Sequence, residues 1–217
     1  MKKIIPALLL LAMVAPALLA QDSGGRRSVE VTGGTNHSRF TDEGAECLLG
    51  WCFGADVILC ENGPLRFSTG AQYRNSGSKY KSGEDFGEEG GYSFETRERL
   101  GYLNIPVEAR YEFGAGKIKP FVRGGGTFGL LLSAKSKTIS NFNGRKDENE
   151  TDIKNLKKSA NLALSLGGGV SFPLGKYRGL VSVRYLVGLT NIVKNKNAPS
   201  ARTNDLTYAV GLGIPIL

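Results

Sequence analysis

Runs of residues that alternate between apolar and polar side chains dominate this chain after its first twenty residues. In the run 102–113, every second residue from Leu103 to Phe113 is apolar, while Glu108 and Arg110 lie on the opposite alternation. Strict alternation is typical of a β-strand that has one apolar face and one polar or small face. The clearest runs cover 65–73, 102–113, 162–172 and 206–214, and less regular ones cover 28–36, 49–59, 117–133 and 179–190. The sequence therefore predicts eight strands.

The segments between these runs alternate between long and short. The long ones are 37–48, 75–99, 134–158 and 191–204, and the short ones are 60–64, 114–116 and 173–177. Tight turns on one side and long loops on the other are typical of a chain that crosses the outer membrane with tilted strands of about ten residues. The sheet must then close, because lipid cannot satisfy an open edge. A soluble eight-stranded barrel is the alternative, and it would place the large aliphatic side chains inside. We expect an all-β, eight-stranded antiparallel up-and-down transmembrane β-barrel with both termini in the periplasm.

The first twenty residues have the features of a secretory signal peptide. Lys2 and Lys3 precede an apolar run from Ile4 to Leu19, and small residues lead to Ala20. This arrangement predicts cleavage after Ala20, and the alternative is an uncleaved membrane anchor. We therefore expect a signal peptide at 1–20 and one barrel domain at 21–217, exported to the outer membrane of a Gram-negative bacterium.

Charged residues occupy the polar alternation of several predicted strands. An arginine that faces lipid near the bilayer midplane costs roughly 2–4 kcal/mol, so these side chains should point into the lumen. An eight-stranded barrel has an interior that side chains just fill. The predicted lumen residues are Asp56, Arg66, Arg74, Glu108, Arg110, Glu112, Arg123 and Arg184. Mixed signs favour a network of ion pairs in a filled lumen, and an ion pathway or a small porin is the alternative.

Several motifs resemble one known family. They are the segment 102–111 (YLNIPVEARY), the turn 114–116, the segment 119–126 (KPFVRGGG), and the segments 166–170 and 183–191. Together they resemble the outer-membrane β-barrel domain family often labelled PorT-like, which is common in Bacteroidota, and the resemblance covers nearly the whole mature chain. It implies an integral outer-membrane barrel without common catalytic residues. The family's namesake acts in protein secretion, so the resemblance implies a role in secretion or envelope assembly.

Catalytic and metal chemistry have little support in the sequence. The three cysteines lack CxxC spacing and His37 is the one histidine, so we expect no zinc site, no iron–sulfur site and no cofactor. An outer-leaflet hydrolase or acyltransferase built around His37 and Ser38 is the alternative. Neighbouring residues on a strand point to opposite faces, so this pair should not act together. We expect a chain that is not an enzyme.

Basic residues in the long loops suggest a different kind of function. The segment 191–204 contains Lys194, Lys196 and Arg202 and no acidic residue. Such cations can contact lipopolysaccharide phosphates or acidic glycans, and plain solvated loops are the alternative. Nucleic acid is not expected as a partner, because aromatic residues are not interleaved with these lysines. We therefore expect an anchor or interaction protein whose outer loops meet lipid, lipopolysaccharide, or a protein or glycan partner.

The cysteines test the strand assignment. Cys52 and Cys60 lie eight residues apart on one predicted strand, which places them roughly 26 Å apart. A disulfide needs Cα atoms within about 7 Å. Only Cys47 and Cys52 could form a bond, and we expect free thiols instead.

Overall fold

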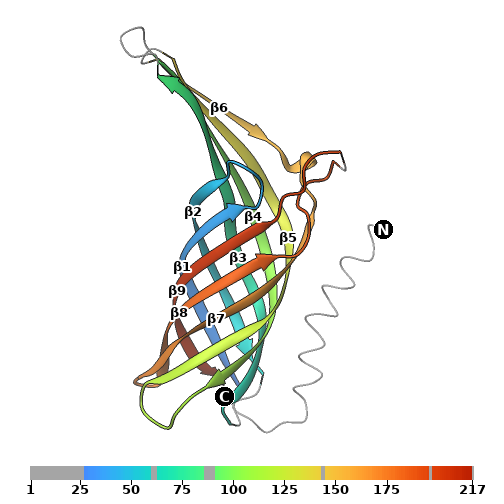
Figure 1. Cartoon of the computed structure of the whole chain (residues 1–217). Coiled ribbons are helices and arrows are strands. Elements are labelled where there is room, and N and C mark those ends of the chain that lie inside the picture. The colour runs from blue at the N-terminus through green and yellow to red at the C-terminus, as the bar shows by residue number, and fades with distance from the viewer. Residues whose placement is uncertain (1–26, 60–62, 86–90, 143–144, 196, 217) are drawn as a thin grey trace.

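The computed structural model describes residues 27–59, 63–85, 91–142, 145–195 and 197–216, and these are almost entirely β-strand. The strands are β1 (Arg27–Phe40), β2 (Glu46–Ile58), β3 (Leu65–Asp85), β4 (Gly91–Glu112), β5 (Lys119–Phe142), β6 (Arg145–Asp152), β7 (Ala160–Leu174), β8 (Tyr177–Gly188) and β9 (Thr203–Ile216). A short 3₁₀ helix, η2 (Lys154–Leu156), lies between β6 and β7. Figure 1 shows the strands wound at a steep tilt around a common axis.

Eight of the nine strands form a closed antiparallel ring. Each pairs with its neighbours along the chain, except that β5 pairs with β7 and leaves β6 outside the ring. The ring closes where β1 pairs with β9, with Arg27 opposite Ile216. We call the end of the barrel that holds these two residues and the short β2–β3, β4–β5 and β7–β8 connections the turn end, and the opposite end the loop end. The predicted eight-stranded antiparallel barrel is confirmed.

The apolar face of the sheet points outward. Large apolar side chains such as Val107, Leu166 and Val210 lie on the outside of the ring, and Leu166 is 71% exposed. Their neighbours along each strand are buried in the lumen, as in β8, where exposed and buried residues alternate from Leu180 to Gly188. A soluble barrel would have the reverse arrangement. The outward apolar band is the surface that a lipid bilayer covers.

Two of the four predicted long loops are wrong. Most of 75–99 is strand, because β3 continues to Asp85 and β4 begins at Gly91, and most of 134–158 is strand in β5 and β6. The predicted loop 37–48 is also shorter, since β1 ends at Phe40 and β2 begins at Glu46. Beyond the lipid both faces of a strand meet water, so the apolar alternation that marks a strand in sequence is lost there.

These extensions continue the same sheet above the ring. We call residues 77–85, 91–99, 135–142 and 145–152 the outer sheet, which contains the ends of β3, β4 and β5 together with β6. Figure 1 shows it rising on one side of the barrel, well past the ends of β1 and β2. Its strands are held in register by continuous cross-strand pairing, up to Tyr92 opposite Phe142.

The predicted signal peptide at 1–20 and its cleavage site lie outside the described residues. Within the described part of the chain, no helix is long and apolar enough to cross a membrane. The thiols of Cys47 and Cys52 are free, with Cys47 exposed and Cys52 half-buried, whereas Cys60 lies outside the described residues.

Candidate functional site

A carboxylate at the centre of the lumen collects three donors from three other strands. Glu108 of β4 is buried and accepts hydrogen bonds from Arg123 Nε at 2.7 Å, Ser165 Oγ at 2.5 Å and Arg184 Nη1 at 3.2 Å. Because β5, β7 and β8 contribute these donors, the contacts connect four neighbouring strands through the interior. A buried carboxylate needs this degree of compensation to stay charged.

A second ion pair crosses the lumen between strands that are not neighbours. Arg110 of β4 forms a bidentate ion pair with Glu30 of β1, with both N···O distances at 2.5 Å. The Arg110 guanidinium also lies 4.5 Å from the centre of the Phe121 ring. Strands β2 and β3 separate β1 from β4 in the ring, so this pair blocks the interior from one wall to the opposite one.

Further polar contacts lie on both sides of this central layer. Toward the turn end, Glu112 pairs with Arg66 at 3.0 Å and with Arg178 at 3.5 Å. Toward the loop end, Asp205 accepts hydrogen bonds from Asn36 Nδ2 at 3.0 Å and Ser76 Oγ at 3.1 Å. The lumen is therefore crossed by charged or hydrogen-bonded side chains at three levels.

Glycines make room for this network. An added Cβ at Gly125, which lies opposite Glu108, would come within 2.1 Å of the Val107 carbonyl oxygen. At Gly70, opposite Asp56, it would come within 2.6 Å of the Asp56 carboxylate. A side chain at either position would displace backbone or a lumen charge, which explains part of the high glycine content.

An apolar cluster covers the lumen at the loop end. It joins the end of β1, the upper parts of β4 and β5 and the two long connections, through Phe40, Leu100, Tyr102, Leu131, Ala134, Ile153, Ile192 and Ala201. We call this cluster the mouth cap. Lys157 links Phe40 of β1 to Glu98 of β4, since its ammonium group lies 5.4 Å from the Phe40 ring centre and 2.5 Å from Glu98 Oε2. The barrel therefore ends in a conventional hydrophobic core where a pore would open.

The structure places all eight predicted lumen residues in the interior, where each is buried. Buried polar residues that sequence reasoning missed include Glu30, Asn36, Gln72 and Asp205. Glu30 carried a usable signal, because it stands between Val29 and Val31 in a predicted strand. Asp205 had none, since it lay at the border of a predicted loop. Gln72 donates to both carboxylate oxygens of Asp56, at 2.9 and 2.7 Å.

The remaining predicted positions lie apart from the lumen. His37 is exposed and meets the Tyr208 ring edge-on at 5.9 Å, while Ser38 is buried and donates to the Gly77 carbonyl at 2.8 Å. The two side chains point to opposite faces, as predicted, and do not form a pair. Lys194 and Arg202 are exposed in the β8–β9 connection, and Lys196 lies outside the described residues. Within the described residues, no group of histidine, cysteine and acidic side chains could hold a metal ion.

The outward face of the outer sheet carries exposed ion pairs. Glu148 of β6 lies 2.6 Å from Lys137 Nζ and 2.8 Å from Lys146 Nζ. Hydrogen bonds from these two ammonium groups hold the pKa of Glu148 at about 2. A similar pair between Lys135 and Glu150, at 2.6 Å, lowers the pKa of Glu150. These contacts link β5 to β6 outside the lipid.

The chain is similar to several outer membrane proteins of known structure. Among solved structures, similar chains include Neisserial surface protein A (14% identity, 86% of this chain and 96% of that chain covered, TM-score 0.46). They also include the outer membrane protein OprG from Pseudomonas aeruginosa (10% identity, 89% and 98% covered, TM-score 0.45). The attachment invasion locus protein Ail of Yersinia pestis is a third (12% identity, 88% and 99% covered, TM-score 0.38).

No curated protein sequence matches this chain. A family model described as "Outer membrane protein beta-barrel domain" matches residues 19–194, which is most of the chain. The chain therefore belongs to the outer membrane protein beta-barrel domain family, whose members are integral proteins of the Gram-negative outer membrane.

Proposed function

We propose that this protein is a non-conducting and non-catalytic anchor that presents the outer sheet to a partner at the cell surface. The observation that supports this most strongly is the closure of the lumen at two heights. The Glu30–Arg110 pair crosses the lumen on the turn-end side, and the mouth cap covers the loop end. A solute would have to break both a desolvated ion pair and an apolar core to pass, which disfavours a porin.

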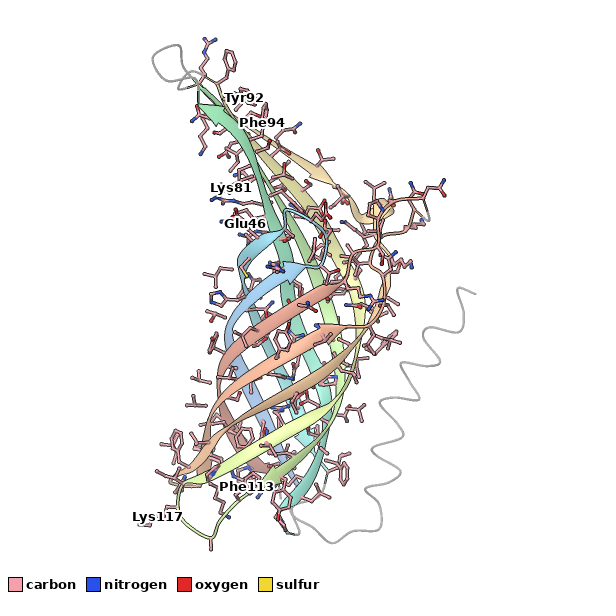
Figure 2. The ribbon with its side chains drawn as sticks, in the orientation of Figure 1. Glu46, Lys81, Tyr92, Phe94, Phe113 and Lys117 are labelled. Atoms are coloured by element: carbon pink, nitrogen blue, oxygen red, sulfur yellow. The ribbon has the colours of Figure 1, made fainter. Side chains whose placement is uncertain are left out.

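The outer sheet offers a surface for a partner. Tyr92 and Phe94 lie on one face of β4 with their ring centres 5.6 Å apart, and Phe142 stands opposite Tyr92 on β5. Phe94 is 45% exposed and Phe142 is 65% exposed, and Figure 2 shows Tyr92 and Phe94 near the far tip of the outer sheet. Exposed aromatic side chains away from lipid are typical of a contact surface.

A more specific role follows from the motifs. The segments at 102–111 and 119–126 support placing the protein in the PorT-like branch found in Bacteroidota, and a role in secretion or envelope assembly. A lipid-modifying enzyme has less support, because His37 faces outward and Ser38 faces the lumen.

Conductance measurements test the closure. The purified protein, refolded and reconstituted into planar bilayers, should show no steady channel. Its folded state should be checked by heat-modifiable migration on a detergent gel, where a closed barrel migrates differently before and after boiling. A stable conductance of porin size from folded protein would overturn the proposal.

Site-specific photo-crosslinking in cells tests the contact surface. A photoreactive residue at Phe94 should crosslink to a partner, while the same residue at Phe113 should not. Figure 2 shows Phe113 at the turn end, just past β4, so it is an equally exposed aromatic control far from the outer sheet. Crosslinks from position 113 alone, or from neither position, would contradict a partner bound at the outer sheet.

A further inference from the structure

The outer wall of the barrel has an aromatic cluster below the outer sheet. The rings of Trp51, Phe53 and Tyr73 stack on one another, with centres 4.9 to 5.6 Å apart. Trp51 and Phe53 are exposed on the lipid-facing side of β2. The Tyr73 hydroxyl lies over Gly101, where an added Cβ would meet it at 2.4 Å. Aromatic side chains with one polar tip mark the level where lipid chains give way to headgroups.

Cations lie on the same outward face, just beyond this aromatic cluster. Tyr73 is the cross-strand partner of Leu103, and Arg99 follows four residues further along β4 toward the loop end. That separation is about 13 Å along the strand, or about 10 Å of height at a tilt near 40°. Arg99 therefore lies at the level of the lipid headgroups.

Several of these cations lie directly opposite one another on neighbouring strands, which gives electrostatic repulsion within the protein. Arg99 of β4 is the direct cross-strand partner of Lys135 of β5. One row further from the lipid, Arg97 lies between Lys79 and Lys137. Directly opposed residues in a sheet have Cβ atoms about 4.5–5.5 Å apart, and like charges at that distance destabilise the pairing. An anion between two such cations removes the repulsion.

Acidic side chains of the protein pair with every one of these five cations except Arg99. The paired cations and their acidic partners are Lys79 with Glu46, Arg97 with Glu95, Lys135 with Glu150, and Lys137 with Glu148. Figure 2 shows Glu46 beside Lys81 at the edge of this cluster, where the two groups lie 3.6 Å apart. Arg99 is exposed and forms no ion pair with a carboxylate of the described residues.

We propose that Arg99 and Lys135 bind a phosphate group of lipopolysaccharide on the outside of the barrel. Arg99 provides a guanidinium fork that matches phosphate geometry, and Lys135 adds a second charge. Lys135 is 61% exposed and its pair with Glu150 is a surface pair, so turning to a phosphate costs it little. The proposal depends on the location in the outer membrane and not on the proposed anchor function.

The surroundings favour a lipid phosphate over a soluble anion. The aromatic cluster of Trp51, Phe53 and Tyr73 lies on the turn-end side of the cations, where Tyr73 pairs with Leu103 on the strand of Arg99. Acyl chains and phosphate can therefore be bound at the same time. Lipopolysaccharide is the lipid that combines phosphates with acyl chains in the outer leaflet, the side that the loop end faces. The site is thus continuous with the lipid-covered surface of the barrel.

Binding of defined lipids to the full chain tests the proposal. Folded protein in a neutral detergent would be titrated with bisphosphorylated lipid A, and the affinity measured by native mass spectrometry. The variant R99Q/K135Q should bind at least about tenfold more weakly than wild type, since it loses two charge-assisted contacts. Lys117→Gln is the matched control, because Figure 2 shows Lys117 at the turn end, and its affinity should stay at the wild-type value. Heat-modifiable migration shows that each variant is folded.

Three further probes separate the sources of the anion. Dephosphorylated lipid A should bind wild type as weakly as bisphosphorylated lipid A binds the double variant. Inorganic phosphate, in about tenfold molar excess over lipid A, should not displace lipid A from the protein. Phosphatidylglycerol should bind at least about tenfold more weakly than lipid A. Equal affinity of wild type and double variant for lipid A would overturn the site. Equal affinity for phosphatidylglycerol, or displacement by inorganic phosphate, would overturn the assignment to lipopolysaccharide.

Discussion

The lumen and the outer sheet use ion pairs of the same chemistry in opposite surroundings. In the lumen, the Arg110 and Glu30 side chains are 2% and 1% exposed. In the outer sheet, the Lys137 and Glu148 side chains are 39% and 40% exposed at a similar distance. A buried pair that loses one partner leaves an uncompensated charge, whereas water takes over when an exposed pair is broken.

The choice of cation follows this difference. Every cation among the buried described residues is an arginine: Arg66, Arg74, Arg110, Arg123 and Arg184. In the outer sheet, lysines such as Lys135 and Lys137 predominate. Arginine can satisfy several acceptors with its planar fork and is more weakly hydrated than lysine, which suits a filled lumen. The ion pairs of the lumen thus determine which side chains can face inward, and those of the outer sheet only support its register.

The largest effect should come from removing the central carboxylate. Glu108→Gln keeps the size of the side chain but leaves Arg123 and Arg184 without their nearest counter-charge. We expect a loss of about 3–5 kcal/mol in the free energy of unfolding. Urea unfolding in lipid vesicles measures it, with fluorescence of the single tryptophan, Trp51, as the signal. A loss below about 1 kcal/mol, as for a surface pair, would remove the distinction between the two regions.

A smaller loss is expected when the mouth cap is weakened. Phe40→Ala removes a buried ring from an apolar cluster that lies close to water, so part of the space can be filled from outside. We expect a loss of about 3 kcal/mol in the free energy of unfolding, at the low end for buried aromatic side chains. Phe142→Ala, which truncates an exposed ring of the outer sheet, is the control. If both variants lose the same stability, the mouth cap is not a core.

The sequence predicted the ring because lipid imposes a pattern on it. Every membrane-spanning strand must carry apolar side chains outward and fit charges such as Arg110 inward, so the alternation is visible in one sequence. No such rule applies above the lipid. Lys79, Glu95 and Lys137 stand in water, and the opposite faces of their strands mix polar side chains with a few aromatic ones, so these segments looked like loops. Cross-strand pairing, which joins residues far apart in the chain, determines the structure there.

The lumen residues were predictable as a set and not as pairs. The cost of exposing Arg123 or Arg184 to lipid is a local argument that needs no partner. Their shared partner Glu108 depends on the stagger of four strands, which alternation does not encode. The mouth cap was missed for a related reason. Phe40, Ile153 and Ile192 lie in segments predicted as loops, and their apolar side chains come together only in the closed ring.

An isosteric change in the outer sheet should have a much smaller effect than the change at Glu108. Glu148→Gln removes the charge that Lys137 and Lys146 share, but both ammonium groups remain hydrated. We expect the urea midpoint, followed by Trp51 fluorescence, to stay within error of wild type. A shift comparable to that of Glu108→Gln would mean that the outer sheet and the barrel unfold as one unit held by these pairs.

The smallest effect is a pH dependence confined to the outer sheet. Hydrogen bonds from Lys137 and Lys146 lower the pKa of Glu148 from 4.5 to about 2 in the folded protein. A carboxylate with a lowered pKa contributes stability that is present above its unfolded value, near 4.5, and is lost as the pH falls toward 2. Carbon-detected NMR of the Glu148 carboxyl, assigned by comparison with Glu148→Gln, should give a titration midpoint near 2. Added salt at about 1 M, where the Debye length is about 3 Å, should move the midpoint up toward 4.5, because the pair is exposed. A midpoint near 4.5 at low salt would show that β6 is not held to β5 by this pair.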